Sequence, residues 1–327
     1  MSQTIRKVAV IGAGIMGHGI AQVCALAGRQ VTLVDAMPEA IRSAPARIQK
    51  SVQMLCDNGL LPAAQASEVA TKLTFTTRME EGVEGAELII EAIPEKLALK
   101  QQLIEELDVL CAPSVIFASN TSAIPIQMLA GSSKHPERVI GTHFFNPAQI
   151  VPLVEVIAPV STSADVLKTV MEFFKDAGKK PVHVRKDIPG FIGNRLQAAL
   201  AREAMSLVEN DVASVEDIDT VIKYSLALRM PFSGILEQRD LNGLDTHLSI
   251  TETLYPNLED AKEALPVLKD KVARGEYGLK SGKGFYDWTR ESRSAVVKRK
   301  DQQLVSMLKF FRAEVEAERK FFEAIPE

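Results

Sequence analysis

The fold of this chain is decided by Val8-Ala9-Val10-Ile11-Gly12-Ala13-Gly14-Ile15-Met16-Gly17. Its apolar first part predicts a buried strand, and its G-x-G-x-x-G pattern predicts a tight turn that leads into a helix. Gly12 would make the turn, Gly14 would let the backbone approach a pyrophosphate, and Gly17 would let the helix pack closely on the strand. The free N–H groups at the start of the helix would hold the phosphates. The stretch therefore predicts a dinucleotide site.

A second strand supplies the rest of the dinucleotide fingerprint. A helix that ends near Gly28 is followed by an apolar run over residues 30–34, which delivers Asp35 about 20 residues beyond the glycines. The Asp35 carboxylate would accept hydrogen bonds from ribose hydroxyls and would repel a 2′-phosphate. Ala36 and Met37 bring no arginine that could hold such a phosphate. We therefore expect NAD, and not NADP, as the cofactor.

Charge and composition argue against several classes of partner. The chain has a formal net charge of −4, with 46% hydrophobic and 24% charged residues, which is ordinary for a folded enzyme. This balance gives no electrostatic footprint for nucleic acid or an anionic membrane, and no apolar run is long enough to span a bilayer. Cys24, Cys56 and Cys111 are scattered and predict neither a disulfide frame nor a metal site. With no apolar signal region before the first strand, we expect the cytoplasm as the location.

Strands and helices alternate along the first part of the chain. Further strands are expected over residues 73–76, 86–92, 115–118, 139–145, 151–157 and 181–185, and helices over 38–58, 61–72, 96–111 and 164–177. This alternation predicts an α/β fold with a parallel, Rossmann-like doubly wound sheet, in which 38–72 is an inserted helical hairpin. Beyond Pro189 the strand signals end and helical periodicity begins. We therefore expect an NAD-binding domain over 1–187, a smaller all-α domain over 188–288 and a charged helical tail over 289–327.

Polar side chains near the carboxyl edge of the expected sheet are the candidates for chemistry. Ser122 follows the fifth strand, while His143 and Glu155 each lie within an apolar strand. Oxidation of an alcohol by NAD requires a base for the hydroxyl proton, and a histidine whose other nitrogen is held by a carboxylate can act as one. His143 and Glu155 could form this pair. The alternative is that His143 is a hydrogen-bonded core residue.

Several separate motifs resemble the L-3-hydroxyacyl-CoA dehydrogenase family. They are the glycine turn and residues 119–122, 143–147, 186–195, 242–245 and 280–286, and the resemblance extends to about Trp288. It implies that His143 is the general base and that Glu155 orients it and supports its charge. It also implies that Ser122 and Asn194 hydrogen-bond the substrate oxygens.

The same resemblance implies the surroundings of the cofactor and the assembly. Besides the glycines and Asp35, the residues around NAD would be Glu95, Lys100, Ser122, Asn146 and Lys280, with Asn146 also lining the substrate pocket. The alternatives are a helix cap for Ser122, a helix-start turn for Asn194 and a solvated surface position for Lys100. A homodimer through the helical domain is implied as well, because that domain alone is too small for much stability.

The sequence departs from the family where CoA would bind. Members that act on acyl-CoA carry lysines toward the end of the helix at 51–58, which meet the CoA phosphates, whereas residues 54–59 here contain no cation.

We expect NAD-dependent oxidation of an L-3-hydroxyacyl-CoA, such as 3-hydroxybutyryl-CoA, to the 3-oxoacyl-CoA. The alternative close behind is the same chemistry on a free hydroxy acid or a hydroxy or aldehyde ring compound, as in gulonate, carnitine or pyridine degradation. Arg229 or Arg239 could then bind a substrate carboxylate. A structural, crystallin-like use of the fold is a further alternative, which the presence of His143, Glu155, Ser122 and Asn194 opposes.

Overall fold

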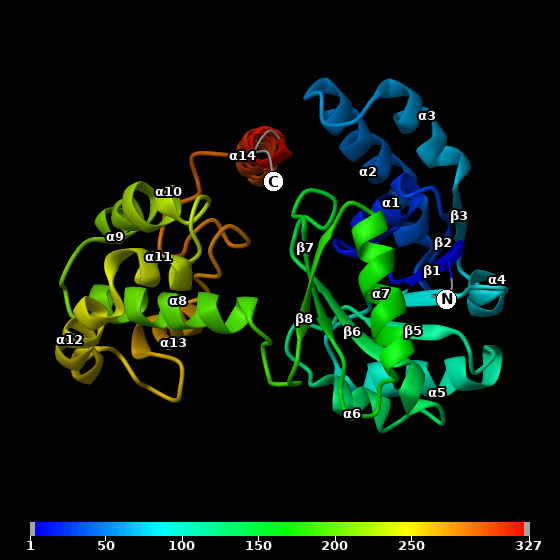
Figure 1. The fold of residues 1–327 in the computed structure, drawn as a ribbon, viewed down its shortest axis with the longest axis horizontal. Coiled ribbons are helices and arrows are strands. Elements are labelled where there is room, and N and C mark those ends of the chain that lie inside the picture. Colours follow the sequence, from blue (N-terminus) through cyan, green and yellow to red (C-terminus); the bar gives the residue numbers. More distant parts are fainter. Residues whose placement is uncertain (1–3, 324–327) are drawn as a thin grey trace. The chain divides into compact units, whose positions relative to one another are not determined.

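The computed structural model describes residues 4–323 of the chain. They form two compact units, the first containing residues up to Asn194 together with 304–309, and the second containing 195–303 and the rest of the last helix. Figure 1 follows the chain through these units by colour. The first unit is α/β, and every strand of the described chain lies in it.

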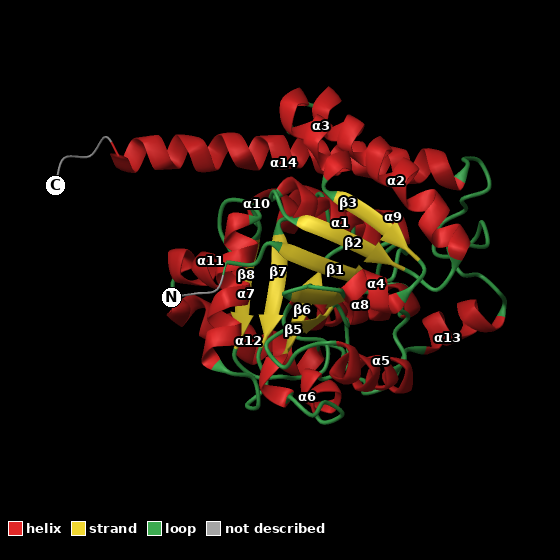
Figure 2. Cartoon of the chain, turned by 90° about the vertical axis from the view of Figure 1, so that its right-hand side faces the viewer, coloured by secondary structure: helices red, strands yellow, loops and turns green. Residues whose placement is uncertain are grey.

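A single sheet forms the centre of the first unit (Figure 2). Its strands are β1 Lys7–Ile11, β2 Gln30–Val34, β3 Leu73–Thr76, β4 Leu88–Glu91, β5 Ile116–Ser119, β6 Val139–Phe144, β7 Leu153–Ile157 and β8 Lys180–Val184. They are ordered β3-β2-β1-β4-β5-β6-β7-β8. The strand order reverses at β1 and β4, which is the switch point where an open α/β sheet binds its ligand. The Rossmann-like prediction is confirmed.

Helices connect the strands and make up the second unit. Those before residue 190 are α1 Gly17–Leu26, α2 Pro38–Asp57, α3 Ala63–Thr71, α4 Met79–Val83, α5 Leu97–Leu110, α6 Ile126–Ala130, the 3-10 turn η1 Pro136–Arg138 and α7 Ala164–Asp176. Those after it are α8 Gly193–Glu209, α9 Val215–Val221, the π-helical η2 Ile222–Leu226, α10 Ala227–Arg229, α11 Ile235–Asn242, α12 Leu244–Leu254, η3 Tyr255–Asn257, α13 Pro266–Ala273 and α14 Arg293–Glu323. Over residues 4–323, no helix is both long and apolar enough to cross a membrane.

One end of the sheet departs from the expected parallel arrangement. β7 runs antiparallel to β6, and β8 runs parallel to β7. The cause is the short connection over residues 145–152, which contains no helix and cannot make the crossover that a parallel neighbour needs. The three extra strands exist as expected, and the sheet is parallel except at the pairing of β6 with β7.

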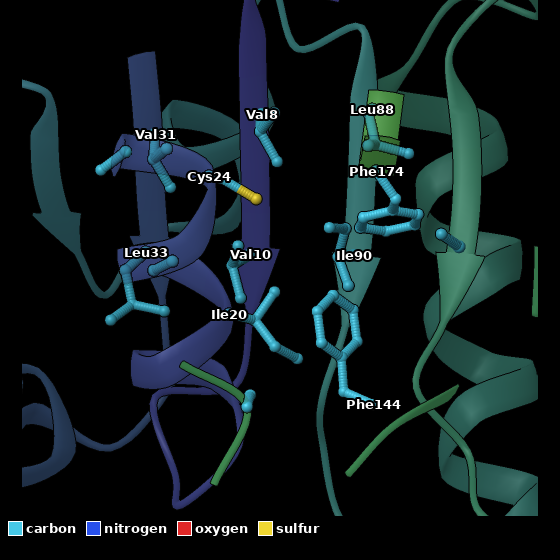
Figure 3. Packing of buried hydrophobic residues seen from close by; sticks show 14 of the residues in the cluster. Val8, Val10, Ile20, Cys24, Val31, Leu33, Leu88, Ile90, Phe144 and Phe174 are labelled. Carbon is cyan, nitrogen blue, oxygen red and sulfur yellow. The ribbon is translucent and has the colours of Figure 1, made fainter. Parts of the chain in front are cut away.

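Apolar side chains cover both faces of the sheet. On one face, Val10 of β1 and Ile90 of β4 belong to the same buried cluster as Ile20 of α1 (Figure 3). On the other face, Ile89 of β4 belongs to the same cluster as Ile104 of α5. All five side chains are at most 1% exposed, and burying such a side chain contributes about 1.5–3 kcal/mol. The packing on both faces fixes the strand ends, where the polar residues of the site lie.

Candidate active site

The glycine turn between β1 and α1 is shaped as a dinucleotide site requires. Gly12 has a φ of +102°, and a Cβ there would come within 2.6 Å of the Ala92 carbonyl oxygen. A Cβ on Gly17 would collide with the carbonyl oxygen of Gly12. A Cβ on Gly14 would meet nothing within 4 Å, so open space lies over this residue. A pyrophosphate therefore fits here, against the N–H groups at the start of α1.

Asp35 follows β2 and contacts this turn. Its Oδ2 accepts a hydrogen bond from the Ala13 N–H at 2.7 Å, and its Oδ1 accepts one from the Met37 N–H at 2.8 Å. The carboxylate therefore lies at the glycine turn, where the fingerprint places the ribose of the adenosine half. A negative charge at this point favours ribose hydroxyls over a 2′-phosphate.

Arg47 of α2 also reaches the glycine turn, although it was not among the residues predicted for the site. Its guanidinium donates to the carbonyl oxygens of Ala13 at 2.6 Å and Gly14 at 3.2 Å. A signal was present, because α2 buries Ala44 and Ser51, and helical spacing places Arg47 on the same inward face. The turn thus carries a fixed positive charge beside the phosphate position.

His143 and Glu155 are directly opposite each other on β6 and β7. His143 Nδ1 lies 2.8 Å from Glu155 Oε2, and both side chains are at most 4% exposed. Cross-strand neighbours project from the same face of a sheet, so the strand pairing itself sets this contact. The rings of Phe145 and Phe191 lie 4.6 and 5.6 Å from the imidazole ring. The pair is therefore buried in an apolar environment.

The second oxygen of Glu155 is held by the backbone. Oε1 accepts hydrogen bonds from the N–H groups of Ile192 at 2.9 Å and Gly193 at 2.8 Å, where α8 begins. Burial alone would raise the pKa of Glu155, but these hydrogen bonds, that from His143 and the charge of His143 hold its pKa below the usual value. Glu155 therefore stays ionised and favours a proton on Nδ1 of His143. In the neutral imidazole, Nε2 is then the nitrogen that can accept a proton.

Ser122 lies in the turn after β5 and is tied to the start of α8. Its carbonyl oxygen accepts a hydrogen bond from Asn194 Nδ2 at 2.9 Å, and Asn194 directly follows the glycine whose N–H holds Glu155. In the same turn, Asn120 Oδ1 accepts a hydrogen bond from the Phe144 N–H at 2.9 Å. These contacts bring Ser122 and Asn194 to the two strands that carry the histidine and the glutamate. The cap of α6 is Pro125, so the cap alternative for Ser122 is wrong.

The remaining predicted residues lie in different surroundings. Asn146 follows β6 and is exposed. Lys100 is 1% exposed and forms ion pairs with Glu91 and Glu95, so the surface alternative for Lys100 is wrong. Lys280 is exposed in a turn of the second unit. Among the described residues, no group of three His, Cys, Asp or Glu side chains could hold a metal ion.

The fold and the glycine turn place this protein in the class of NAD-dependent dehydrogenases, and comparison with known proteins gives the family. The model for "3-hydroxyacyl-CoA dehydrogenase, NAD binding domain" matches residues 7–188, and that for "3-hydroxyacyl-CoA dehydrogenase, C-terminal domain" matches residues 190–288. The chain belongs to the 3-hydroxyacyl-CoA dehydrogenase family. The NAD prediction is confirmed.

Similar proteins of this family act on different substrates. The chain is 35% identical to 5-formyl-3-hydroxy-2-methylpyridine 4-carboxylate 5-dehydrogenase of Mesorhizobium japonicum, over 93% of this chain and 97% of that protein. It is 39% identical to a probable 3-hydroxybutyryl-CoA dehydrogenase of Bacillus subtilis, over 88% and 99%. A crystal structure of the pyridine-carboxylate enzyme, described as an NAD+ dependent dismutase, matches with a TM-score of 0.89 and 34% identity, over 94% and 99%. That of (S)-3-hydroxybutyryl-CoA dehydrogenase from Ralstonia eutropha matches with a TM-score of 0.73 and 35% identity, over 88% and 100%.

Proposed function

We propose that this dehydrogenase oxidises a hydroxyl-bearing carbon of a small molecule, with His143 as the general base. The observation that carries the proposal is the buried 2.8 Å contact between His143 Nδ1 and Glu155 Oε2. Because His143 Nδ1 is hydrogen-bonded to the Glu155 carboxylate, Nε2 accepts the hydroxyl proton of the substrate. The same residues would act whether the hydroxyl belongs to an alcohol or to a hydrated aldehyde.

The chain supplies proton transfer, orientation and charge stabilisation. NAD, when bound by these residues, would supply the acceptor for the hydride of the substrate carbon. His143 becomes positively charged when it takes the proton, and the ionised Glu155 stabilises that charge in a buried site. Ser122 and Asn194 hydrogen-bond the substrate oxygens and hold the reacting carbon in place. The residues proposed to hold NAD are Gly12, Gly14, Gly17, Asp35, Ser122 and Asn146. The family resemblance adds Lys280, and also Glu95 and Lys100, which form an ion pair with each other.

For the substrate we propose a small hydroxy or aldehyde acid without CoA. α2 ends at Asp57 and has no basic residue in its last turn, so CoA phosphates would meet a carboxylate where members acting on acyl-CoA offer lysine. The similarity to the pyridine-carboxylate enzyme, with its TM-score of 0.89 over 94% of the chain, supports the same choice.

The second candidate is an L-3-hydroxyacyl-CoA, which would be oxidised to the 3-oxoacyl-CoA. It is favoured by the 39% identity to the probable 3-hydroxybutyryl-CoA dehydrogenase. The proposed catalytic residues serve both candidates, because either substrate presents a hydroxyl group to the base.

A substrate panel separates the candidates. NAD reduction would be followed with free hydroxy acids, aldehyde acids of pyridine type and matched 3-hydroxyacyl-CoA esters. We expect turnover of a free acid, with no lower KM for its CoA ester, because the last turn of α2 offers no basic residue to the CoA phosphates. A CoA ester with a much lower KM than its free acid would assign the thioester instead. No turnover of any member by the wild type, or full activity in His143→Ala, would overturn the proposed function.

We further propose that the second unit pairs with the same unit of another copy. From α9 to α13, no helical residue is buried. Large apolar side chains such as Leu236, Leu244 and Leu248 are more than 60% exposed. Large apolar side chains that are exposed in such number on one unit are typical of an interaction site. A homodimer through this unit, as the family resemblance implied, would cover it.

We also retain the cytoplasm as the proposed location. Cys24, Cys56 and Cys111 are all free, as is usual in a reducing compartment. Burial raises the pKa of the Cys24 thiol to about 12, so this thiol is unreactive at neutral pH.

A further inference from the structure

A buried ion cluster lies beneath the turn that carries Ser122. Glu91, the last residue of β4, is 0% exposed, and Lys100 of α5 is 1% exposed. Lys100 Nζ lies 2.6 Å from Glu91 Oε1 and 3.3 Å from Glu95 Oε2. One ammonium group therefore joins two carboxylates, and it joins β4 and α5 to the segment between them.

The Glu91 carboxylate fixes the base of the turn. Its Oε2 accepts a hydrogen bond from Ser119 Oγ at 2.6 Å, at the end of β5, and its Oε1 accepts one from the Ile93 N–H at 2.7 Å. Burial raises the pKa of Glu91, although the Lys100 ammonium and the Ser119 hydroxyl oppose this. Glu91 is therefore anchored on both oxygens, and it anchors Lys100 in turn.

The Glu95 carboxylate holds the part of the turn that contains Ser122. A single oxygen, Oε1, accepts hydrogen bonds from Thr121 Oγ1 at 2.6 Å, the Ser122 N–H at 2.9 Å and the Ala123 N–H at 3.1 Å. Burial acts against its charge, but these bonds and the Lys100 ammonium hold the pKa of Glu95 below its usual value. The other oxygen faces Lys100. Glu95 thus links the buried ammonium to the backbone of Ser122.

Lys100 supplies the ion pair that holds the second oxygen of Glu95. The Glu95 side chain is 42% exposed, so water could solvate its carboxylate if the ammonium were absent. An ionised carboxylate that is not paired prefers water to a partly buried position. Loss of the Lys100 charge would therefore release Glu95 and, with it, the amides of Ser122 and Ala123.

We propose that Lys100 is a positioning residue for Ser122: anchored by Glu91, it holds Glu95, which fixes the turn that presents Ser122 to the substrate. The proposal rests on the proposed function for the role of Ser122, and on the ion pairs and hydrogen bonds of Lys100 and Glu95 for the route. The family resemblance implies that Lys100 lies near NAD, whereas these contacts direct its effect to the Ser122 turn. A direct NAD contact would change cofactor affinity, and a positioning role changes the rate at saturating cofactor.

The first test is hydrogen exchange, which needs no substrate. In Lys100→Met, amide hydrogens of the peptide that contains Ser122 and Ala123 should exchange at least about 10-fold faster. Glu95→Gln should give the same change, and it is the safer variant because its side chain is partly exposed. Lys96→Met is the matched control, since Lys96 precedes the same helix and is exposed. In this variant the amide hydrogens of the Ser122 peptide should exchange at the wild-type rate.

The second test is kinetic, with the substrate that the panel identifies. Lys100→Met should lower kcat by about 10- to 100-fold at saturating NAD, because small misplacements of a positioning group have effects of this size. KM for NAD should change less than about 3-fold. The double variant Lys100→Met/Glu95→Gln should be no slower than the slower single variant, because both changes break one link.

The outcomes separate this inference from the proposed function. If Glu95→Gln leaves the exchange of the Ser122 peptide unchanged, the positioning route is overturned, whether or not Lys100→Met folds. An unchanged kcat with a raised KM for NAD in Lys100→Met would overturn it as well and make Lys100 a cofactor ligand. If no substrate is turned over by the wild type, the proposed function fails while the exchange result still decides the role of Lys100.

Discussion

His143 and Glu155 have only each other as charged partners among the described residues. Replacing His143 by Ala removes the proton acceptor, so turnover should fall by about 100- to 10,000-fold. Binding of NADH, followed by its fluorescence, should stay close to that of the wild type. Retained turnover would mean that another group takes the proton.

Glu155→Gln tests the charge of the pair without removing the imidazole. The variant should have a lower maximal rate, because the positive charge on His143 during turnover is no longer stabilised. Maximal rates at saturating substrate check this, with Glu105→Gln on the exposed side of α5 as control; an unchanged maximal rate would contradict a charged partner.

Asp35 gives a separate prediction about the cofactor. Asp35→Ala should weaken NAD binding and narrow the preference for NAD over NADP, because the charge that repels a 2′-phosphate is gone. Dissociation constants for both cofactors, measured beside the exposed control Asp165→Ala, test this. Equal binding of both cofactors by the wild type would refute the role of Asp35.

Residues whose role depends on a local motif were predictable, and those whose role depends on tertiary packing were not. Gly12, Asp35 and His143 are marked by turn spacing or by polarity within an apolar strand. The surroundings of Lys100 depend on Glu91, which another element carries. A weak signal existed, because Lys100 lies three and four positions before the buried Leu103 and Ile104, on the inward side of its helix.

At the scale of elements, a buried ion pair joins α5 to η1. Asp108 Oδ1 lies 2.6 Å from Arg138 Nη2, and the side chains are 1% and 4% exposed. Burial would raise the pKa of Asp108, but hydrogen bonds from the Lys134 N–H, Arg138 and the Ser133 hydroxyl hold its pKa below the usual value. The carboxylate is therefore ionised in the folded protein at neutral pH.

Asp108→Asn should destabilise the first unit. It leaves the buried Arg138 charge without its partner, which costs about 3–5 kcal/mol of unfolding free energy. Because the folded pKa of Asp108 lies below the unfolded one, its stabilisation is complete above the unfolded pKa and is lost as pH falls through the folded pKa. Urea unfolding at neutral and acid pH measures how much free energy of unfolding is lost on acidification. This loss should be smaller in the variant than in the wild type and in the control Asp165→Asn. Identical acid losses would contradict the contribution of this ion pair.

The elements themselves could be predicted closely, but the reversed direction of β7, which β8 shares, could not. β2 and β3 have the expected ends, because apolar runs bounded by turn residues fix them. The apolar pattern of β7 is the same for either strand direction. Its direction follows from the short connection to β6. The apolar pattern does not show that this connection contains no helix.

At the scale of the whole molecule, a dimer is the expected assembly. Sedimentation should give twice the chain mass of 35.7 kDa. Leu248→Asp on α12 should shift the protein toward monomer, because it places a charge in exposed apolar surface of the second unit. Val109→Asp is the control, since Val109 is 76% exposed in the first unit, and it should remain dimeric. A wild-type monomer at micromolar concentration would refute the assembly.

The antiparallel pairing of β6 and β7 has a consequence for how such an enzyme can diversify. The separation of base and carboxylate is set by main-chain hydrogen bonds between neighbouring strands, and not by loops. The end of α2 can therefore accept substitutions or insertions while the proton acceptor stays in register. An enzyme built in this way can acquire a new substrate without having to rebuild its chemistry.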